Sequence, residues 1–254
     1  MVYSKQIIIT AFLALGAVAD TNEPAGRAMF QGVSNVIKAV NQLAQQQGLS
    51  RGLVDDFYCP MTGEMADTVD DAEDLVKDIA KRGRLGSDTK SAIDALASSA
   101  ESYIKYAGSN NMNCDKVEKL HEKVNDVRPF INKRSKCNDF RKRGGLSKRD
   151  SSEDADGLAQ GVTKVIEVLD NEVKTNFNAQ GLDKKEYSDD FICSFTDKLT
   201  KVIEEIEDLA DDGAKVSKAG DVKQSAKSFS SSAKRAGVRC SDKLEKIVEK
   251  ANKL

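Results

Sequence analysis

The side chains best suited to chemistry are two pairs of adjacent carboxylates, each followed by an aromatic residue. Asp55 and Asp56 open the stretch "DDFYC", and Asp189 and Asp190 open "DDFIC". Paired carboxylates can serve in acid–base catalysis or bind calcium. They also suit the start of a helix, where they cap free N–H groups and interact favourably with the helix dipole. We favour capping, because an amphipathic helical pattern begins directly after each pair.

The only histidine, His121, limits the other kinds of site. A Ser-His-Asp triad would need it as the base, and no nucleophile motif surrounds it. A zinc site of the His/Cys type would lack ligands if most cysteines form disulfides. The corresponding position in a second, similar stretch holds Val248. We therefore expect a structural histidine, no enzyme activity, no metal and no cofactor.

Four of the five cysteines fall at matching places in the two halves of the chain. We expect the disulfides Cys59–Cys114 and Cys193–Cys240. Closing a loop of about 50 residues contributes roughly 4 kcal/mol in the chain-entropy model. Cys137 is left over, and a free thiol in an oxidising compartment can link two chains into a dimer.

The cysteines follow a wider duplication, because three stretches recur in the same order. The matching stretches are "QGVSNVIKAV" at 31–40 and "QGVTKVIEVL" at 160–169, "DDFYC" at 55–59 and "DDFIC" at 189–193, and "DKVEKLHEK" at 115–123 and "DKLEKIVEK" at 242–250. Two copies indicate a tandem of domains rather than a solenoid.

Apolar residues recur at helical spacing throughout both copies, as in Val162, Val165, Ile166 and Leu169. No sustained alternating pattern competes with them. The sequence therefore predicts an all-α protein of two tandem, duplicated bundles of about four helices each. We expect each bundle to fold independently and to be closed by one disulfide. In the first copy, Ser87 or Asp88 is expected to be the N-cap of the third helix. The expected domains are residues 20–131 and 156–254.

The N-terminus predicts export. Lys5 precedes an apolar run that ends near Ala17 and Ala19, a small-x-small cleavage signature, so residues 1–19 read as a signal peptide. The run is too short to span a bilayer, and no second run of membrane length follows. We expect a secreted, extracellular protein without a transmembrane segment.

Residues 132–155 are expected to link the two bundles. Residues 132–149 hold 8 Lys/Arg against 1 Asp/Glu, and the acidic run after them is expected to stay solvated. Basic pairs in this strip are candidate sites for proteases of the kexin type, namely Lys133-Arg134 and Lys148-Arg149. We favour cutting after Arg149 over a plain linker. The pairs Lys81-Arg82 and Lys234-Arg235 are expected to be protected within helices.

The formal net charge of −2 conceals two acidic halves around this basic strip. Nucleic-acid binding normally appears as basic residues with aromatic partners on a folded face, and that pattern is absent. A signal peptide followed by cysteine-bearing units separated by Lys-Arg resembles the layout of secreted fungal preproteins such as killer-toxin precursors and some effectors. The resemblance covers layout only, so it assigns no role to any residue.

Two functions fit these expectations. The first is a secreted interaction protein, resembling an effector or toxin, that binds an extracellular protein or surface. The alternative is an extracellular carrier that holds a hydrophobic ligand such as a fatty acid between the helices of each bundle. We favour the interaction protein, because apolar stripes at helical spacing usually form a packed core.

Overall fold

The computed structural model describes residues 22–131, 151–177 and 184–254. Every regular element in these ranges is a helix, which confirms the all-α prediction. Among the described helices, none combines the length and apolar character needed to cross a bilayer. Several predictions fall outside these ranges, namely the signal peptide with Ala17 and Ala19, and the basic residues and cysteine of the central strip, Lys133, Arg134, Cys137, Lys148 and Arg149.

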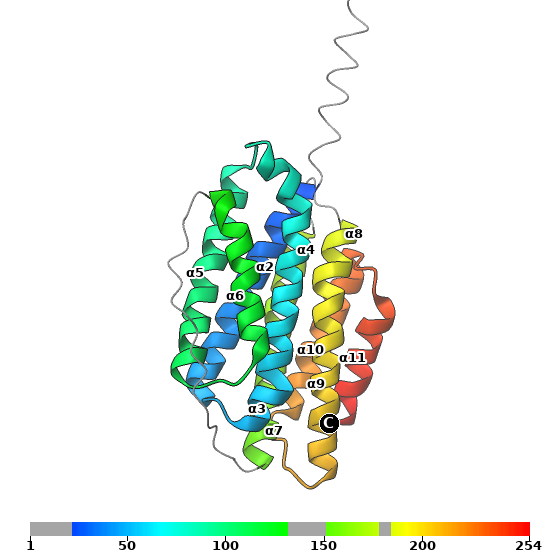
Figure 1. Ribbon diagram of the computed structural model, residues 1–254. Coiled ribbons are helices and arrows are strands. Elements are labelled where there is room, and N and C mark those ends of the chain that lie inside the picture. The colour runs from blue at the N-terminus through cyan, green and yellow to red at the C-terminus, as the bar shows by residue number, and fades with distance from the viewer. Residues whose placement is uncertain (1–21, 132–150, 178–183) are drawn as a thin grey trace, which may run out of the picture.

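The first half, residues 22–131, is built from long antiparallel helices (Figure 1). α2 packs against α4 and α5, and α6 closes the group by packing against the same two helices. The elements are α2 (Asn22–Gln47), α3 (Arg51–Leu53), η1 (Val54–Tyr58), α4 (Cys59–Lys81), α5 (Ser87–Ser109), α6 (Asp115–Val127) and η2 (Arg128–Ile131).

The second half, residues 151–254, repeats this order of elements. α7 packs against α9 and α10, and α11 packs against the same two helices. The elements are α7 (Ser151–Asn176), α8 (Lys184–Glu186), η3 (Tyr187–Ile192), α9 (Cys193–Asp211), α10 (Ala219–Ala236) and α11 (Ser241–Lys253). The turns after α4 and α9 are both closed by a left-handed glycine, Gly83 (φ 67°) and Gly213 (φ 95°), as helix ends often are.

Both predicted disulfides are confirmed. Cys59 is bonded to Cys114 and Cys193 to Cys240, with Cα–Cα distances of 5.7 and 5.8 Å. Each bond joins the start of the helix after the π turn, α4 or α9, to the residue just before the last long helix, α6 or α11. Each disulfide therefore lies within one half of the chain.

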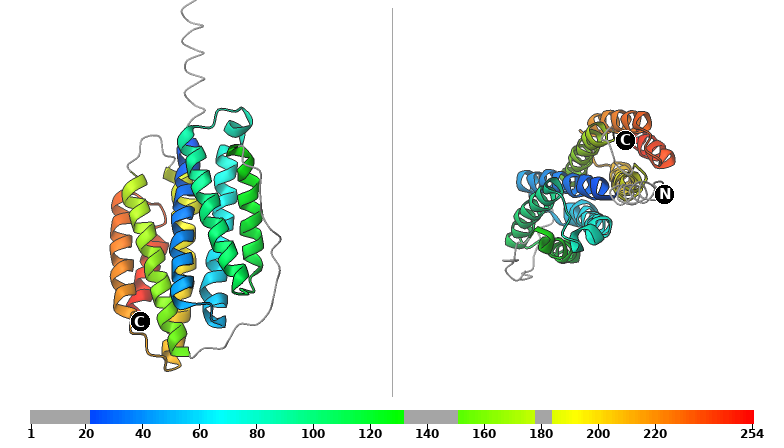
Figure 2. Two further views of the ribbon diagram at one scale, coloured as in Figure 1. Left: turned by 90° about the vertical axis from the view of Figure 1, so that its left-hand side faces the viewer. Right: turned by 90° about the horizontal axis from the view of Figure 1, so that it is seen from above.

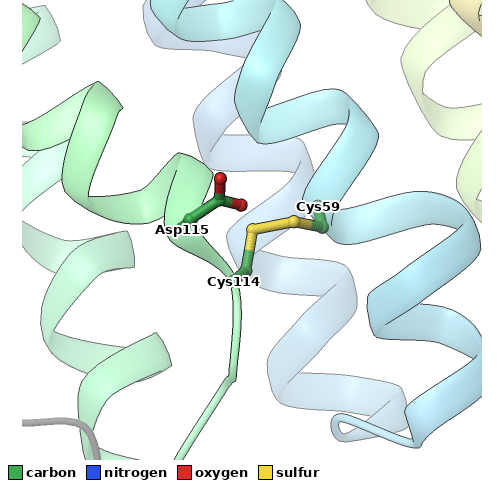
Figure 3. A group of neighbouring side chains, drawn as sticks. All are labelled: Cys59, Cys114 and Asp115. Atoms are coloured by element: carbon green, nitrogen blue, oxygen red, sulfur yellow. A yellow bond between two sulfur atoms is a disulfide. The ribbon is translucent and has the colours of Figure 1, made fainter.

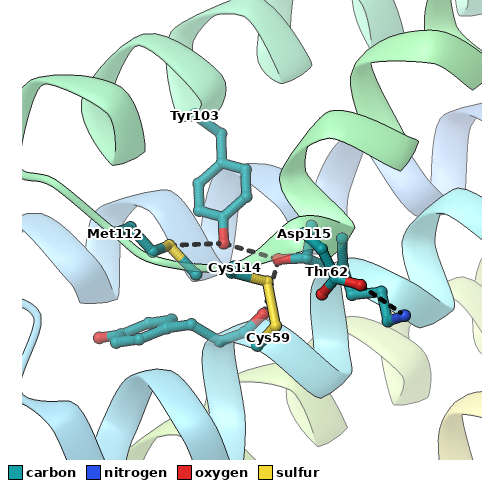
Figure 4. The surroundings of a disulfide bond; sticks show 8 residues. Cys59, Thr62, Tyr103, Met112, Cys114 and Asp115 are labelled. Carbon is teal, nitrogen blue, oxygen red and sulfur yellow. Dashed lines mark hydrogen bonds and ion pairs between the residues drawn. A yellow bond between two sulfur atoms is a disulfide. The ribbon is translucent and has the colours of Figure 1, made fainter. Parts of the chain in front are cut away.

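The interior beside the first disulfide is closely packed and hydrogen-bonded (Figure 4). The hydroxyl of Tyr103, fully buried, lies 2.7 Å from Oγ1 of Thr62 and 3.7 Å from Sδ of Met112. Thr62 in turn donates to the carbonyl of Tyr58 at 2.6 Å. Burial raises the pKa of Tyr103 well above its usual range, so this phenol stays neutral and acts as a structural group.

The carboxylate pairs do not cap helices, so that prediction is wrong. Asp55 and Asp56 lie within η1, a single π turn that joins α3 to α4 without a break. The cap of this helical segment is Ser50, whose hydroxyl accepts a bond from the backbone N–H of Leu53 at 3.2 Å. Asp189 and Asp190 lie in the same way within η3. Because α3 and α8 extend each segment backwards, the acids lie inside it rather than at its start.

The third helix of the first half also begins differently from the prediction. Its N-cap residue is Gly86, and Ser87 is already the first helical residue. The cap is supplied from α2 instead, because Oε1 of Glu23 accepts bonds from the backbone N–H of Gly86 and the hydroxyl of Thr89, both at 2.7 Å. A long-range contact replaces the expected local one.

From Ser151 onward, the acidic run that was expected to stay solvated is helical. α7 begins at Ser151, ahead of the expected domain boundary at residue 156. Tertiary contacts hold the start of this helix: Asp154 accepts a bond from the hydroxyl of Ser50 at 2.5 Å, and Asp156 accepts from the backbone N–H of Ser217 at 2.7 Å.

Helices protect only one of the two remaining basic pairs. Lys234 and Arg235 lie within α10, as expected, and Lys234 pairs with Glu245 at 2.8 Å. Lys81 is the last residue of α4, and Arg82 lies beyond the helix end in an exposed turn. The prediction of helical protection is therefore wrong for Arg82.

The two halves lie side by side and share one core. Figure 2 (right) shows the helices of the first half, blue to green, on one side of the molecule and those of the second half, yellow-green to red, on the other. α2 packs along α7, and buried side chains from both halves form one continuous cluster. The sequence predicted two separate bundles, whereas the described residues form a single packed body.

Candidate functional site

Two glycines bring the halves into close contact. A Cβ added at Gly161 would lie 2.7 Å from Cζ of Phe57, and one at Gly32 would lie 2.5 Å from Cζ of Phe191. Both distances are shorter than carbon atoms of packed side chains tolerate, so each ring occupies the space left by a missing side chain. Both phenylalanines are fully buried. Each half therefore inserts one ring against a helix of the other half.

This contact is reciprocal in sequence as well as in space. Gly32 and Gly161 hold the same place in the matching stretches "QGVSNVIKAV" and "QGVTKVIEVL". Phe57 and Phe191 hold the same place in "DDFYC" and "DDFIC". Each half thus presents the same pair, a glycine on its first long helix and a phenylalanine from its π turn. Such self-complementary contact is the property of a two-fold, isologous interface.

The π turns η1 and η3 position the two rings. A π turn holds one residue more than an α turn, so it changes which side chains face each side of the helix. Consecutive residues are buried in both turns, Phe57 with Tyr58 and Phe191 with Ile192. One α-helical face cannot bury two adjacent side chains equally, since neighbours lie about 100° apart. The turns therefore pack on two sides, and η1 contacts α7 while η3 contacts α2.

A charged pair joins the halves between α4 and α9. Nζ of Lys198 lies 3.8 Å from Oε2 of Glu64, and the hydroxyl of Ser194 donates to Oε1 of Glu64. The Glu64 side chain is only 5% exposed, whereas that of Lys198 is 37% exposed. Burial raises the pKa of Glu64, and the bond from Ser194 and the charge of Lys198 act in the opposite direction.

Carboxylates from both halves also meet near the interface. Burial raises the pKa of Asp56 to about 6, and the charge of Glu205 in α9 adds to this shift. Burial likewise raises the pKa of Asp190 to about 6, with contributions from a hydrogen bond to Glu186 and the charge of Asp71 in α4. Asp56 matches Asp190, and Asp71 matches Glu205, when each is counted from its own cysteine. The acidic contacts are therefore reciprocal too.

Another buried carboxylate, that of Glu172 in α7, receives bonds from both halves. Nδ2 of Asn35 in α2 donates to it at 2.8 Å, and Nδ2 of Asn176 in α7 donates at 2.6 Å. Burial raises the pKa of Glu172, and these hydrogen bonds oppose that shift. A buried carboxylate satisfied in this way fixes the position of α2 along α7.

The predicted site residues are not brought together into a catalytic or metal centre. Asp115 lies beside the sulfurs of Cys59 and Cys114 (Figure 3), but both sulfurs are committed to the disulfide and have no thiolate to offer a metal. His121 is half-buried on α6. Within the described residues, this is the only grouping of metal-binding side chains that lies close enough to hold an ion.

A groove lies between α7 and α10, and its lining bears on the expected lipid carrier. It has a volume of about 490 Å³ and is lined by mostly polar side chains, among them Gln160, Lys164, Glu167, Asp170 and Lys218. An alkyl chain prefers an apolar lining, so this groove does not suit a fatty acid. The interiors of both halves are filled by large side chains.

The chain matches no protein-family model, no curated protein and no solved structure. Sequence reasoning identified the stretches that form the interface but assigned them to helix cores and caps. The missed signal was the glycine in each first stretch: glycine is unfavourable inside a helix by about 1 kcal/mol relative to alanine, which points to a close approach of another element.

Proposed function

We propose that this chain is a secreted, non-enzymatic interaction protein made of two duplicated, disulfide-closed helical domains that pack as one body. The observation that carries the proposal is the reciprocal contact of Phe57 with Gly161 and of Phe191 with Gly32. Matching residues in matching elements are what a duplicated domain that pairs with its own copy would produce.

The outward helices support a binding role with two similar faces. α6 and α11 hold the matching stretches "DKVEKLHEK" and "DKLEKIVEK" and make their main contacts within their own halves. Exposed carboxylates recur at matching positions on them, as at Glu122 and Glu249. Two such faces on one body would bind two equivalent sites of an extracellular protein or surface, and linked binding of this kind raises avidity.

Export and processing belong to the same proposal. The apolar N-terminal run with Ala17 and Ala19 supports removal of residues 1–19 during secretion. The Lys148-Arg149 pair supports cutting just ahead of α7, which begins at Ser151. Cys137 would then remain with the N-terminal product, where it can link two molecules into a dimer.

A native mass spectrum of the protein purified from culture fluid tests the proposal. The expected species contains an N-terminal product starting near Asp20 and a C-terminal product starting at Asp150, each with its own disulfide. Changing Lys148 and Arg149 to Ala should abolish the second product while export continues. Retention of the chain inside the cell would contradict export, and an uncut wild-type chain from Asp20 to Leu254 would contradict processing.

A further inference from the structure

We infer that the interface is a selective pairing surface: the face of the first half around Gly32, Phe57 and Glu64 binds the face of the second half around Gly161, Phe191 and Lys198 in preference to a second copy of itself. The inference rests on the duplication proposed above. Its consequence is that a chain cut between the halves stays together as a defined two-chain molecule.

Shape alone would not make this choice. Each half carries both a protruding ring and a glycine that receives one. In a pair of first halves, Phe57 of one copy would meet Gly32 of the other, and the same fit would arise between second halves through Phe191 and Gly161. The reciprocal fit therefore supplies contact area and packing, but it allows like and unlike halves to pair equally well.

The Glu64–Lys198 contact breaks this equivalence. The two residues lie at the same position relative to Cys59 and Cys193, and yet they contact one another across the interface. A residue that meets its own counterpart lies on the two-fold axis of a symmetric pair. A pair of first halves would place two copies of Glu64 together, and a pair of second halves two copies of Lys198. Like charges at such a contact act against the wrong partner.

Burial makes the discrimination strongest against pairs of first halves. Glu64 is almost completely buried in the unlike pair, and a buried carboxylate without a cation is unfavourable. Asn35 acts in the same direction, because its acceptor Glu172 corresponds to Leu43 in the first half. A pair of first halves would therefore bury Asn35 opposite an apolar side chain.

The test uses the full chain with the recognition sequence of a site-specific protease placed between residues 144 and 149. After cutting, both products should elute together at the volume of the uncut protein at micromolar concentration. Glu64→Lys alone and Lys198→Glu alone should each weaken the association of the cut products at least about tenfold. The double variant E64K/K198E should restore it, because opposite charges face each other again.

Matched controls are available on helices away from the interface. Glu122→Lys on α6 and Lys227→Glu on α10 make the same charge changes at exposed positions and should leave the pairing unchanged. Far-ultraviolet dichroism of each uncut variant reports whether it folds. Should a reversal prevent folding, the neutral variants Glu64→Gln and Lys198→Gln replace it, and each should still weaken association.

A mixing experiment tests the preference for unlike halves. Two cut samples of the Cys137→Ser variant, which cannot form a disulfide between N-terminal halves, carry different tags on those halves; they are mixed, and one tag is captured. C-terminal halves should be recovered with it, and N-terminal halves with the second tag should not. Separation of the wild-type products, failure of the double variant to recover, or capture of like halves would overturn the inference. None of these outcomes depends on natural export or processing, because the cutting site is introduced.

Discussion

Nζ of Lys198 lies 3.8 Å from Oε2 of Glu64, the residue at the corresponding position of the other half. Two corresponding residues meet in this way only where two similar units are related by an approximate two-fold axis. The same relation pairs Phe57 with Gly161 and Phe191 with Gly32. At this axis the first half presents a carboxylate and the second half an ammonium group, so the two sides of the contact differ in charge.

Filling one glycine should strain the interface, and shortening the ring that faces it should relieve the strain. Gly32→Ala places a Cβ 2.5 Å from the Phe191 ring, so we expect the free energy of unfolding to fall by about 1–3 kcal/mol. Adding Phe191→Leu should recover part of this loss in urea unfolding.

The reciprocal pair provides the control. Gly161→Ala should be relieved by Phe57→Leu and not by Phe191→Leu. Equal effects of either leucine on either alanine would contradict the assignment of each ring to the opposite half, since coupling energies are expected only between residues in contact.

Stability should fall as the pH rises through about 6. Asp56, Asp71 and Asp190 each have a pKa raised from 3.8 to about 6, mainly by burial. A carboxyl with a raised folded-state pKa stabilises the fold while it is protonated, and this stabilisation is lost on ionisation. The free energy of unfolding, from urea titrations at constant ionic strength, should be higher at about pH 5 than at about pH 7.5.

Neutral variants should flatten this dependence. Asp56→Asn with Asp190→Asn should raise stability at the higher pH and change it little at the lower one. Asp78→Asn, at an exposed position on α4, is the matched control and should keep the wild-type slope. A free energy of unfolding that increases from about pH 5 to about pH 7.5 would contradict the assignment of raised pKa values to these carboxyls.

Each disulfide should contribute separately to stability. Replacing Cys59 and Cys114 by Ser, or Cys193 and Cys240 by Ser, opens loops with sequence separations of 55 and 47. The chain-entropy model gives roughly 4 kcal/mol for either loss. Peptide mapping without reduction should recover only the two bonds within the halves, and a peptide joining Cys59 to Cys193 would contradict the fold.

Much of this fold was predictable from sequence. Apolar residues at helical spacing, such as Val162, Val165 and Ile166, identify the helices because burial of one face repeats every three to four residues. The matching cysteines identified both disulfides. These features depend on local pattern and on chain order, and the duplication made each half a check on the other.

The interface was not predicted, because it depends on contacts that no local pattern encodes. Phe57 reads as a core residue of its own half, and only the π turn of η1 directs it toward α7. Asp56 reads as a helix cap, since α3 ahead of it is too short to show a periodic pattern. The helical glycines Gly32 and Gly161 were the one available signal of a close approach.

The central claim, that both halves form one packed body, is tested most directly by scanning calorimetry of the uncut protein. A core shared between the halves predicts one heat-absorption peak with a ratio of calorimetric to van't Hoff enthalpy of about 1. Two resolved peaks, or a ratio of about 2, would show halves that unfold independently and would contradict the account.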